Sequence, residues 1–209
     1  MRPPFIFVLL VTSILFSAQS ATASIASAQS PERWWNDAVE AALAQAGPNR
    51  PELLSALQQA PQDDRVAVAF LVENMPLRDL QNLTADFLLT QVEQAAEIQA
   101  GTPWEMPESL YLNYVLPYAN VDEPREPWRQ QLNQICKPLI ENCQTPAETA
   151  QRLNEQLFGK IQVRYSTQRK RANQAPSESM EQGLASCTGL SILLVDACRR
   201  SRLQTNMHT

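Results

Sequence analysis

The sequence is poor in glycine and histidine, and its cysteines are not paired in metal-binding motifs. It contains five glycines, one histidine and four cysteines among 209 residues. So few glycines, together with a helical spacing of apolar residues along most of the chain, argue against an all-β fold. A single histidine and the lack of a C-x-x-C pair argue against a zinc site. We therefore expect no metal and no cofactor.

Positive charge is also in short supply. The chain has 17 basic and 22 acidic residues, and its formal net charge is −5. Such a balance argues against nucleic acid as the main partner. The only basic run, at residues 168–171, has no aromatic residues among its charges, so we expect it to be a solvated loop.

Only one long apolar run occurs, at residues 5–16, and it is too short to span a bilayer. It follows Arg2 and precedes small-residue cleavage sites at 21–23 and 26–28, which is the pattern of a secretory signal peptide. No cysteine follows the run where a lipid could be attached. We therefore expect a signal peptide at residues 1–28 and an exported protein, periplasmic or secreted, without a stable membrane anchor. The oligomeric state is not indicated.

Capping residues and prolines divide the rest of the chain into helices. The first is expected to begin at Ser30 and to run through Trp34 and Trp35 to Gly47. One strand is expected at residues 161–166, where apolar and polar residues alternate. Together these signals predict a mostly α-helical chain with an N-terminal helical region at 29–122, a second region at 123–200 and a disordered tail at 201–209. Further helices are expected over residues 49–57, 63–74, 83–100, 107–115, 125–142 with a disturbance at Pro138, and 145–159.

Cys187 is the strongest candidate for chemistry. Ser186 before it is a good N-cap, which places the thiol in the first turn of a helix. The positive end of the helix dipole favours the thiolate there, and the thiolate is the nucleophilic form of cysteine. Most cysteines near a helix start are small buried residues with only a structural role, and the spacing is compatible with that interpretation too. The apolar residues behind it share one helix face: Leu190, Leu193, Leu194 and Ala197.

Disulfides within this set of cysteines are restricted by helix geometry. Cys187 and Cys198 are expected about 16 Å apart along one helix axis, which is too far for a bond. Cys136 and Cys143 can pair only if Pro138 breaks the helix between them. Gln182 lies shortly before Cys187, where its amide could help to hold an oxyanion, although a water-exposed loop position is the simpler explanation.

Residues 183–199, Gly-Leu-Ala-Ser-Cys-Thr-Gly-Leu-Ser-Ile-Leu-Leu-Val-Asp-Ala-Cys-Arg, resemble the nucleophile helix of the transglutaminase-like superfamily. Strings at 70–76, 113–118 and 126–129 resemble the helical region before the core in some exported bacterial members. The resemblance implies a papain-like α+β fold with a Cys-His-Asp triad, in which Cys187 is the nucleophile. It further implies thiol acyl transfer or amide hydrolysis on a peptide or protein substrate.

The rest of the triad has no credible residue in this sequence. In the family the helix is followed by a Gly-Ile-Pro-Ala-Arg-like turn and by strands bearing the histidine and the acid, but residues 199–203 depart from that pattern. His208 stands in a polar tail, and Asp196 projects from the side of the helix opposite Cys187. We expect a chain truncated or frame-shifted just after the nucleophile helix, with most of the catalytic β-sheet missing. The alternative is a non-catalytic exported helical binding or scaffold protein.

Overall fold

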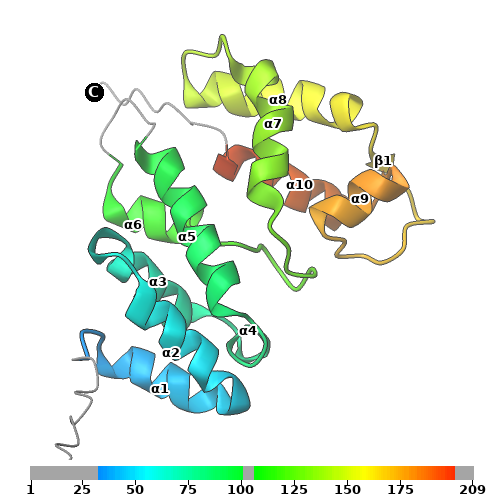
Figure 1. The fold of residues 1–209 in the computed structure, drawn as a ribbon. Helices are drawn as coiled ribbons and strands as arrows, with labels where there is room; N and C mark the ends of the chain where they lie inside the picture. The colour runs from blue at the N-terminus through cyan, green and yellow to red at the C-terminus, as the bar shows by residue number, and fades with distance from the viewer. Residues whose placement is uncertain (1–32, 101–105, 201–209) are drawn as a thin grey trace, which may run out of the picture. The chain divides into compact units, whose positions relative to one another are not determined.

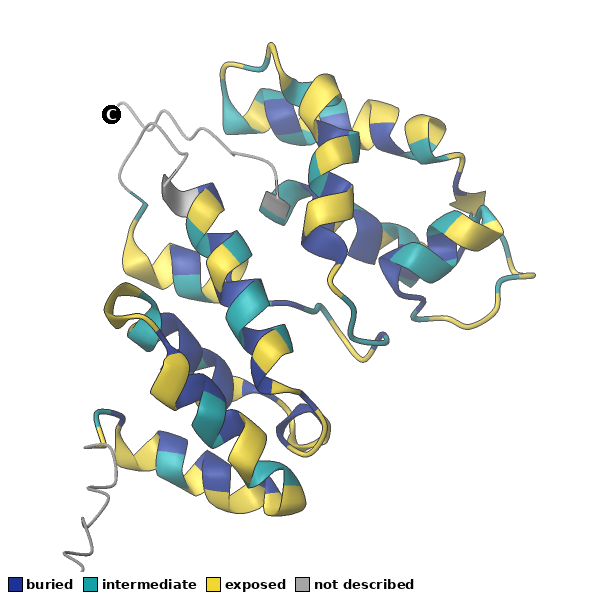
Figure 2. Ribbon diagram, in the orientation of Figure 1, coloured by how far each residue is buried: buried dark blue, intermediate teal, exposed yellow. Residues whose placement is uncertain are grey.

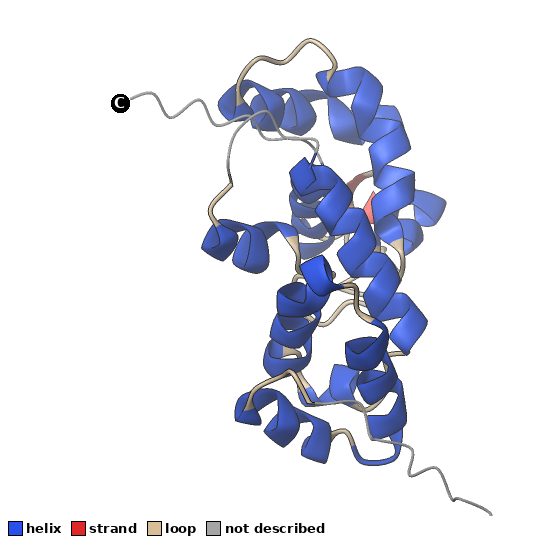
Figure 3. Cartoon of the chain, turned by 60° about the vertical axis from the view of Figure 1, so that its left-hand side comes forward, coloured by secondary structure: helices blue, strands red, loops and turns tan. Residues whose placement is uncertain are grey.

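A computed structural model of the 209-residue chain describes residues 33–100 and 106–200 (Figure 1). These residues are mostly helical and contain one small sheet, as the sequence predicts (Figure 3). The expected signal peptide and the tail with His208 lie outside the described residues. Among those that are described, no helix has the length and apolar character needed to cross a membrane.

The first part of the fold is a set of short helices joined by tight turns. Three helices pack against one another: α1 (Asp37–Gln45), α2 (Arg50–Gln59) and α3 (Arg65–Asn74). The longer α5 (Ala85–Ala100) packs against α2 and α3. The connections between them contain two single 3-10 turns, η1 (Gly47–Asn49) and η2 (Gln62–Asp64), and the short helix α4 (Leu77–Leu80).

The predicted start of the first helix is wrong. Residues 33–36 are not helical, and α1 begins at Asp37 because the Asn36 side chain caps it by accepting a hydrogen bond from the Val39 N–H at 2.9 Å. Trp34 and Trp35 therefore precede the helix. They pack edge to face, with ring centroids 5.6 Å apart, and the Trp34 indole donates to the Leu57 carbonyl at 3.2 Å.

The buried residues of these helices form one apolar cluster. Figure 2 shows the buried residues of each helix in dark blue. Helical spacing of apolar residues puts these side chains on one face of each helix. Residues from α1, α2, α3 and α5 all contribute side chains that are fully buried: Val39, Leu43, Leu53, Leu57, Val68, Val72 and Leu88.

A crossing segment leads from this cluster to the second part of the fold. It contains α6 (Glu108–Leu110) and the π-helical turn η3 (Tyr111–Val115), whose last bond runs from the Leu116 N–H to the Tyr111 carbonyl at 2.9 Å. Residues 117–127 then continue without a helix to α7. The predicted helix at 107–115 is confirmed.

The second part of the fold is built around α7 (Trp128–Ile140), α8 (Pro146–Ile161) and α10 (Cys187–Arg200), which pack against one another. Pro138 lies inside α7, and the helix ends two residues later. Thr145 and Glu148 form the predicted start of α8, because the Thr145 hydroxyl accepts from the Glu148 N–H at 3.1 Å. The predicted end at Gly159 is wrong: α8 continues to Ile161, and Gln162 ends it in a left-handed conformation.

Two short strands pair in parallel beside these helices. β1 (Arg164–Tyr165) pairs with β2 (Leu184–Ala185), and α9 (Pro176–Gln182) lies between them in sequence. The first strand falls within the predicted one, but β2 was not predicted. Gly183 ends α9 with φ +65°, and its carbonyl accepts from the Arg164 N–H at 3.1 Å, so the turn itself begins the pairing.

The helix that follows the strands is covered by the elements before it. Leu193 and Ala197 of α10 are fully buried, whereas Leu190 and Leu194 are more accessible. Ala197 joins an apolar cluster with α7 and α8, and Leu193 joins another with Val163 and β2. Helices therefore bury much of the apolar face of α10.

Candidate functional site

Cys187 is the first residue of α10, and it is exposed. The hydroxyl of Ser186 accepts a hydrogen bond from the Gly189 N–H at 2.9 Å, which confirms the predicted N-cap. The same hydroxyl donates to the Ala172 carbonyl. Strand β2 is thus followed directly by the capped start of α10, where Cys187 lies, and the capping residue Ser186 is buried.

Close packing behind the thiol explains the small residues around it. A Cβ added at Gly189 would lie 3.1 Å from the Ala185 Cβ, so the first turn of α10 sits directly against β2. At Gly183 the backbone is left-handed, and an added Cβ would lie 3.2 Å from the Gln162 carbonyl oxygen. These two glycines allow the strand pair and the helix start to approach one another.

The amide of Gln182 is engaged with a neighbouring loop. Its oxygen accepts from the Lys170 N–H at 2.9 Å and from the Gln174 side chain at 3.1 Å. Its nitrogen donates to the Gln168 carbonyl at 3.2 Å. The structure therefore uses this amide to hold residues 168–174, and its role toward an oxyanion stays a prediction.

No histidine lies in the described part of the chain. The first acidic residue after Cys187 is Asp196, and its partners do not include Cys187. Asp196 is fully buried, and its Oδ1 accepts from the Asn120 amide at 2.9 Å and lies 3.3 Å from an Arg199 nitrogen. These partners belong to the crossing segment and to α10 itself. Asp196 consequently supports the placement of α10 rather than the chemistry of the thiol.

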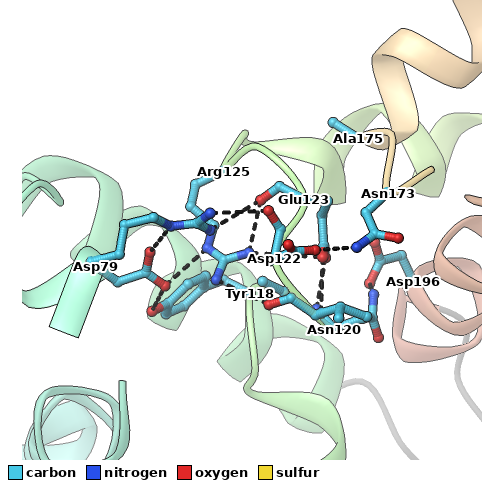
Figure 4. A network of polar contacts seen from close by, with 12 residues as sticks. Asp79, Tyr118, Asn120, Asp122, Glu123, Arg125, Asn173, Ala175 and Asp196 are labelled. Atoms are coloured by element: carbon cyan, nitrogen blue, oxygen red, sulfur yellow. Dashed lines mark hydrogen bonds and ion pairs between the residues drawn. The ribbon is translucent and has the colours of Figure 1, made fainter. Parts of the chain in front are cut away.

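A buried polar network surrounds that contact (Figure 4). Asp79 accepts from the Tyr118 hydroxyl at 2.8 Å and from Arg125 at 2.9 Å. Arg125 also donates to the Glu123 carbonyl at 2.8 Å, and the Glu123 carboxylate accepts from the Asn120 N–H at 2.7 Å. Sequence reasoning missed this network. The available signal was the clustering of polar residues between Tyr118 and Arg125.

The network perturbs two titratable groups. Burial raises the pKa of Asp196 to about 7; the Asn120 hydrogen bond and the Arg199 charge oppose that rise, and the Glu123 charge adds to it. Burial also raises the pKa of Tyr118 far above its usual value, and the charge and hydrogen bond of Asp79 act in the same direction. Both groups are held by partners from other elements.

Replacing Asp196 by asparagine should remove a pH dependence of stability. Because the folded-state pKa is about 7 and the ordinary value is 3.8, the folded chain binds this proton more tightly than the unfolded chain. The stability that the proton contributes is complete below about pH 4 and is lost as the pH rises to about 7. Between pH 5 and 7 the native chain should lose about 1 kcal/mol or more that the variant keeps. Thermal unfolding across this range measures it, and parallel curves would contradict the assignment.

A hollow of about 200 Å³ lies beside the network, between the first part of the fold and the crossing segment. All of its lining residues fall between Phe70 and Arg125, and none comes from α10. It therefore offers no substrate cavity at Cys187.

The remaining cysteines are not assigned to a catalytic or metal-binding site. Cys136 is buried and Cys143 is half-buried, and the two do not form a disulfide bond. Burial raises the pKa of Cys198. Within the described residues, no group of three or more histidine, cysteine, aspartate or glutamate side chains is placed to hold a metal ion.

Comparison with known proteins supports one superfamily. Residues 133–207 match the family model of the transglutaminase-like superfamily core. The matched region covers a little over a third of the chain, and it runs from within α7 through α8, β1, α9 and β2 to α10. This transglutaminase-like region includes Cys187 and the string that carried the resemblance. No curated protein and no solved structure matches the chain.

Proposed function

We propose that the chain is an exported thiol-dependent domain of the transglutaminase-like type, acting by acyl transfer or amide hydrolysis on a peptide or protein substrate. One observation carries the proposal: an exposed cysteine opens a capped helix inside the region that matches the superfamily. The sequence pattern of residues 1–28 supports export.

The chemistry assigned to Cys187 is nucleophilic. Its thiolate attacks the carbonyl carbon of an amide, a carbon–sulfur bond forms, and the carbon–nitrogen bond breaks as the amine leaves with a proton. Water or another amine then resolves the thioester. Backbone N–H groups at a helix start have no intrahelical acceptor, so the Cys187 N–H can donate to the developing oxyanion.

Efficient turnover also needs a base that is oriented by a third group. In the described residues the sheet has two strands and there is no histidine. We therefore propose that the described residues supply the nucleophile helix without a complete catalytic apparatus. Such a chain should accept an acyl group from an activated donor and release it slowly.

Acylation by p-nitrophenyl acetate tests the nucleophile directly, because an activated ester depends less on a base. We expect mass spectrometry to find the acetyl group on Cys187 at pH 7, formed at least about tenfold faster than on Cys143. The Cys187→Ser variant should lose this labelling and keep its circular dichroism spectrum.

If Cys187 is labelled no faster than Cys143, or is not labelled at all, the proposed nucleophilic role of Cys187 is rejected. That outcome would favour the alternative function, in which the chain is a non-catalytic binding or scaffold protein and Cys187 is structural.

A further inference from the structure

Strand β2, which ends two residues before Cys187, is held along both of its edges. On the β1 side, the carbonyls of Gly183 and Ala185 accept from two backbone N–H groups, at 3.1 Å and 2.9 Å. The carbonyl between them belongs to Leu184 and points to the opposite edge, because successive carbonyls along a strand alternate in direction. There it accepts from the side-chain amide of Gln174 at 3.1 Å. The sheet has two strands in the described part of the chain, so this amide stands where a third strand would pair.

A second hydrogen bond extends this contact toward the thiol. The hydroxyl of Ser186 donates to the Ala172 carbonyl. Ala172 comes two residues before Gln174, whereas Ser186 comes two residues after Leu184, so the two short segments run antiparallel and are joined at both ends. Cys187 therefore follows a segment that β1 holds on one side and the loop before α9 holds on the other.

The Gln174 amide is fully buried, and its burial has a cost. Its oxygen has no hydrogen-bond partner within the described residues, and an unpaired buried acceptor is unfavourable. Its nitrogen, besides the Leu184 carbonyl, lies 3.1 Å from the Gln182 side-chain oxygen and 3.4 Å from the Glu178 carbonyl. One amide thus ties β2 to two points of α9. An apolar side chain of the same length would avoid the unpaired oxygen, so the amide contributes placement of β2 rather than filling of the core.

We infer that Gln174 is a positioning residue for acyl transfer at Cys187, and that it acts through β2. The sulfur must reach a carbonyl carbon while the Cys187 N–H points at the carbonyl oxygen, and this N–H belongs to the peptide that joins Ser186 to Cys187. The end of β2 sets the direction of that peptide, so a small shift of the strand separates the donor from the oxyanion and slows the reaction. The inference rests on the proposed function and adds a residue that the sequence pattern did not single out.

Two reagents that attack the same sulfur separate positioning from access. With p-nitrophenyl acetate a sulfur–carbon bond forms, nitrophenolate leaves, and the carbonyl oxygen gains negative charge on the way. With iodoacetamide the sulfur displaces iodide from a saturated carbon, and no oxyanion develops. The ratio of the acylation rate to the alkylation rate at Cys187, measured by mass spectrometry on the full chain at one pH, therefore reports support of the oxyanion. Exposure and ionisation of the thiol affect both rates and cancel in the ratio.

Gln174→Met fills a similar space and cannot donate a hydrogen bond. Its acylation rate at Cys187 should fall at least about fivefold, while its alkylation rate stays within about twofold of the native rate. Gln174→Asn keeps an amide on a side chain that is one carbon shorter, so its nitrogen cannot reach both β2 and α9, and we expect the same selective fall. Gln151→Met, at an exposed position of α8, is the matched control and should change neither rate.

Circular dichroism shows whether each variant keeps the native helix content. An equal change in the two rates, or loss of the folded spectrum in both Gln174 variants, would assign this residue a purely structural role and overturn the inference. An unchanged ratio in both variants would overturn it as well. The proposed function fails separately, if Cys187 of the native chain is acylated no faster than Cys143.

Discussion

Replacing Arg129 by alanine should lower the free energy of unfolding by about 3–5 kcal/mol. The side chain is fully buried, and its Nε donates to the Gln91 amide oxygen at 3.0 Å. One terminal nitrogen lies 2.8–3.0 Å from the carbonyl oxygens of Val115, Leu116 and Pro117. These carbonyls stand at the end of η3, where the helix dipole is negative. Alanine would leave the buried Gln91 oxygen and Leu116 carbonyl, and the partly buried Val115 and Pro117 carbonyls, without this donor.

Arg129→Lys separates geometry from charge. A lysine ammonium is a single point on a flexible stem, so it cannot serve the glutamine and the three carbonyls together. It also loses the stacking of the guanidinium over the Trp128 ring, which lies 4.6 Å away. We expect this variant to recover only part of the stability that Arg129→Ala loses, whereas Arg152→Ala on the exposed side of α8 should change stability by less than about 0.5 kcal/mol. Urea unfolding followed by circular dichroism measures all three variants, and a loss below about 1.5 kcal/mol for Arg129→Ala would contradict the assignment.

Asp79→Ala should be the second most damaging change, with a loss of about 3–4 kcal/mol. Asp79 is only 2% exposed, and its removal leaves the Arg125 guanidinium and the Tyr118 hydroxyl without their acceptor. Arg125 is itself nearly buried, so water cannot replace the carboxylate at low cost. The consequence should extend to the crossing segment, because Arg125 also holds the Glu123 carbonyl.

A double-mutant cycle checks the origin of that loss. Tyr118→Phe removes one hydrogen bond and should cost about 1 kcal/mol alone. Combined with Asp79→Ala it should cost clearly less than the sum, because the phenylalanine no longer leaves a buried hydroxyl without an acceptor. Thermal and urea unfolding give the coupling energy, and strict additivity of the two changes would show that the pair does not interact.

Local signals predicted most helices, because the starts and ends of helices depend on residues that are adjacent in sequence. Pro51 and Gly47 mark the boundary of α1 and α2, and the Thr145–Glu148 capping box marks α8. The failures have equally local causes. The Ser30 start is wrong because the Asn36 side chain caps α1, and the Gly159 end is wrong because Gln162 takes the left-handed position that ends α8.

The site was predictable only in part for the same reason. The cap at Ser186 and the first-turn position of Cys187 follow from neighbouring residues, and the structure confirms both. Strand β2 has two residues, which is too short to show alternation. The contact of Asn120 with Asp196 joins positions 76 residues apart, and no periodicity in the sequence reports such a pairing.

The division of the apolar core has a consequence for cooperativity. The buried members of the first cluster lie between Trp35 and Tyr118, and those of the other two lie between Cys136 and Ala197. Arg129 of α7 donates to Gln91 of α5, and Asp196 of α10 accepts from Asn120 of the crossing segment. The halves therefore resemble two foldons joined by a polar seam. Opening such a seam breaks the hydrogen bond between Asn120 and Asp196, so pH can weaken the joint while each core stays folded.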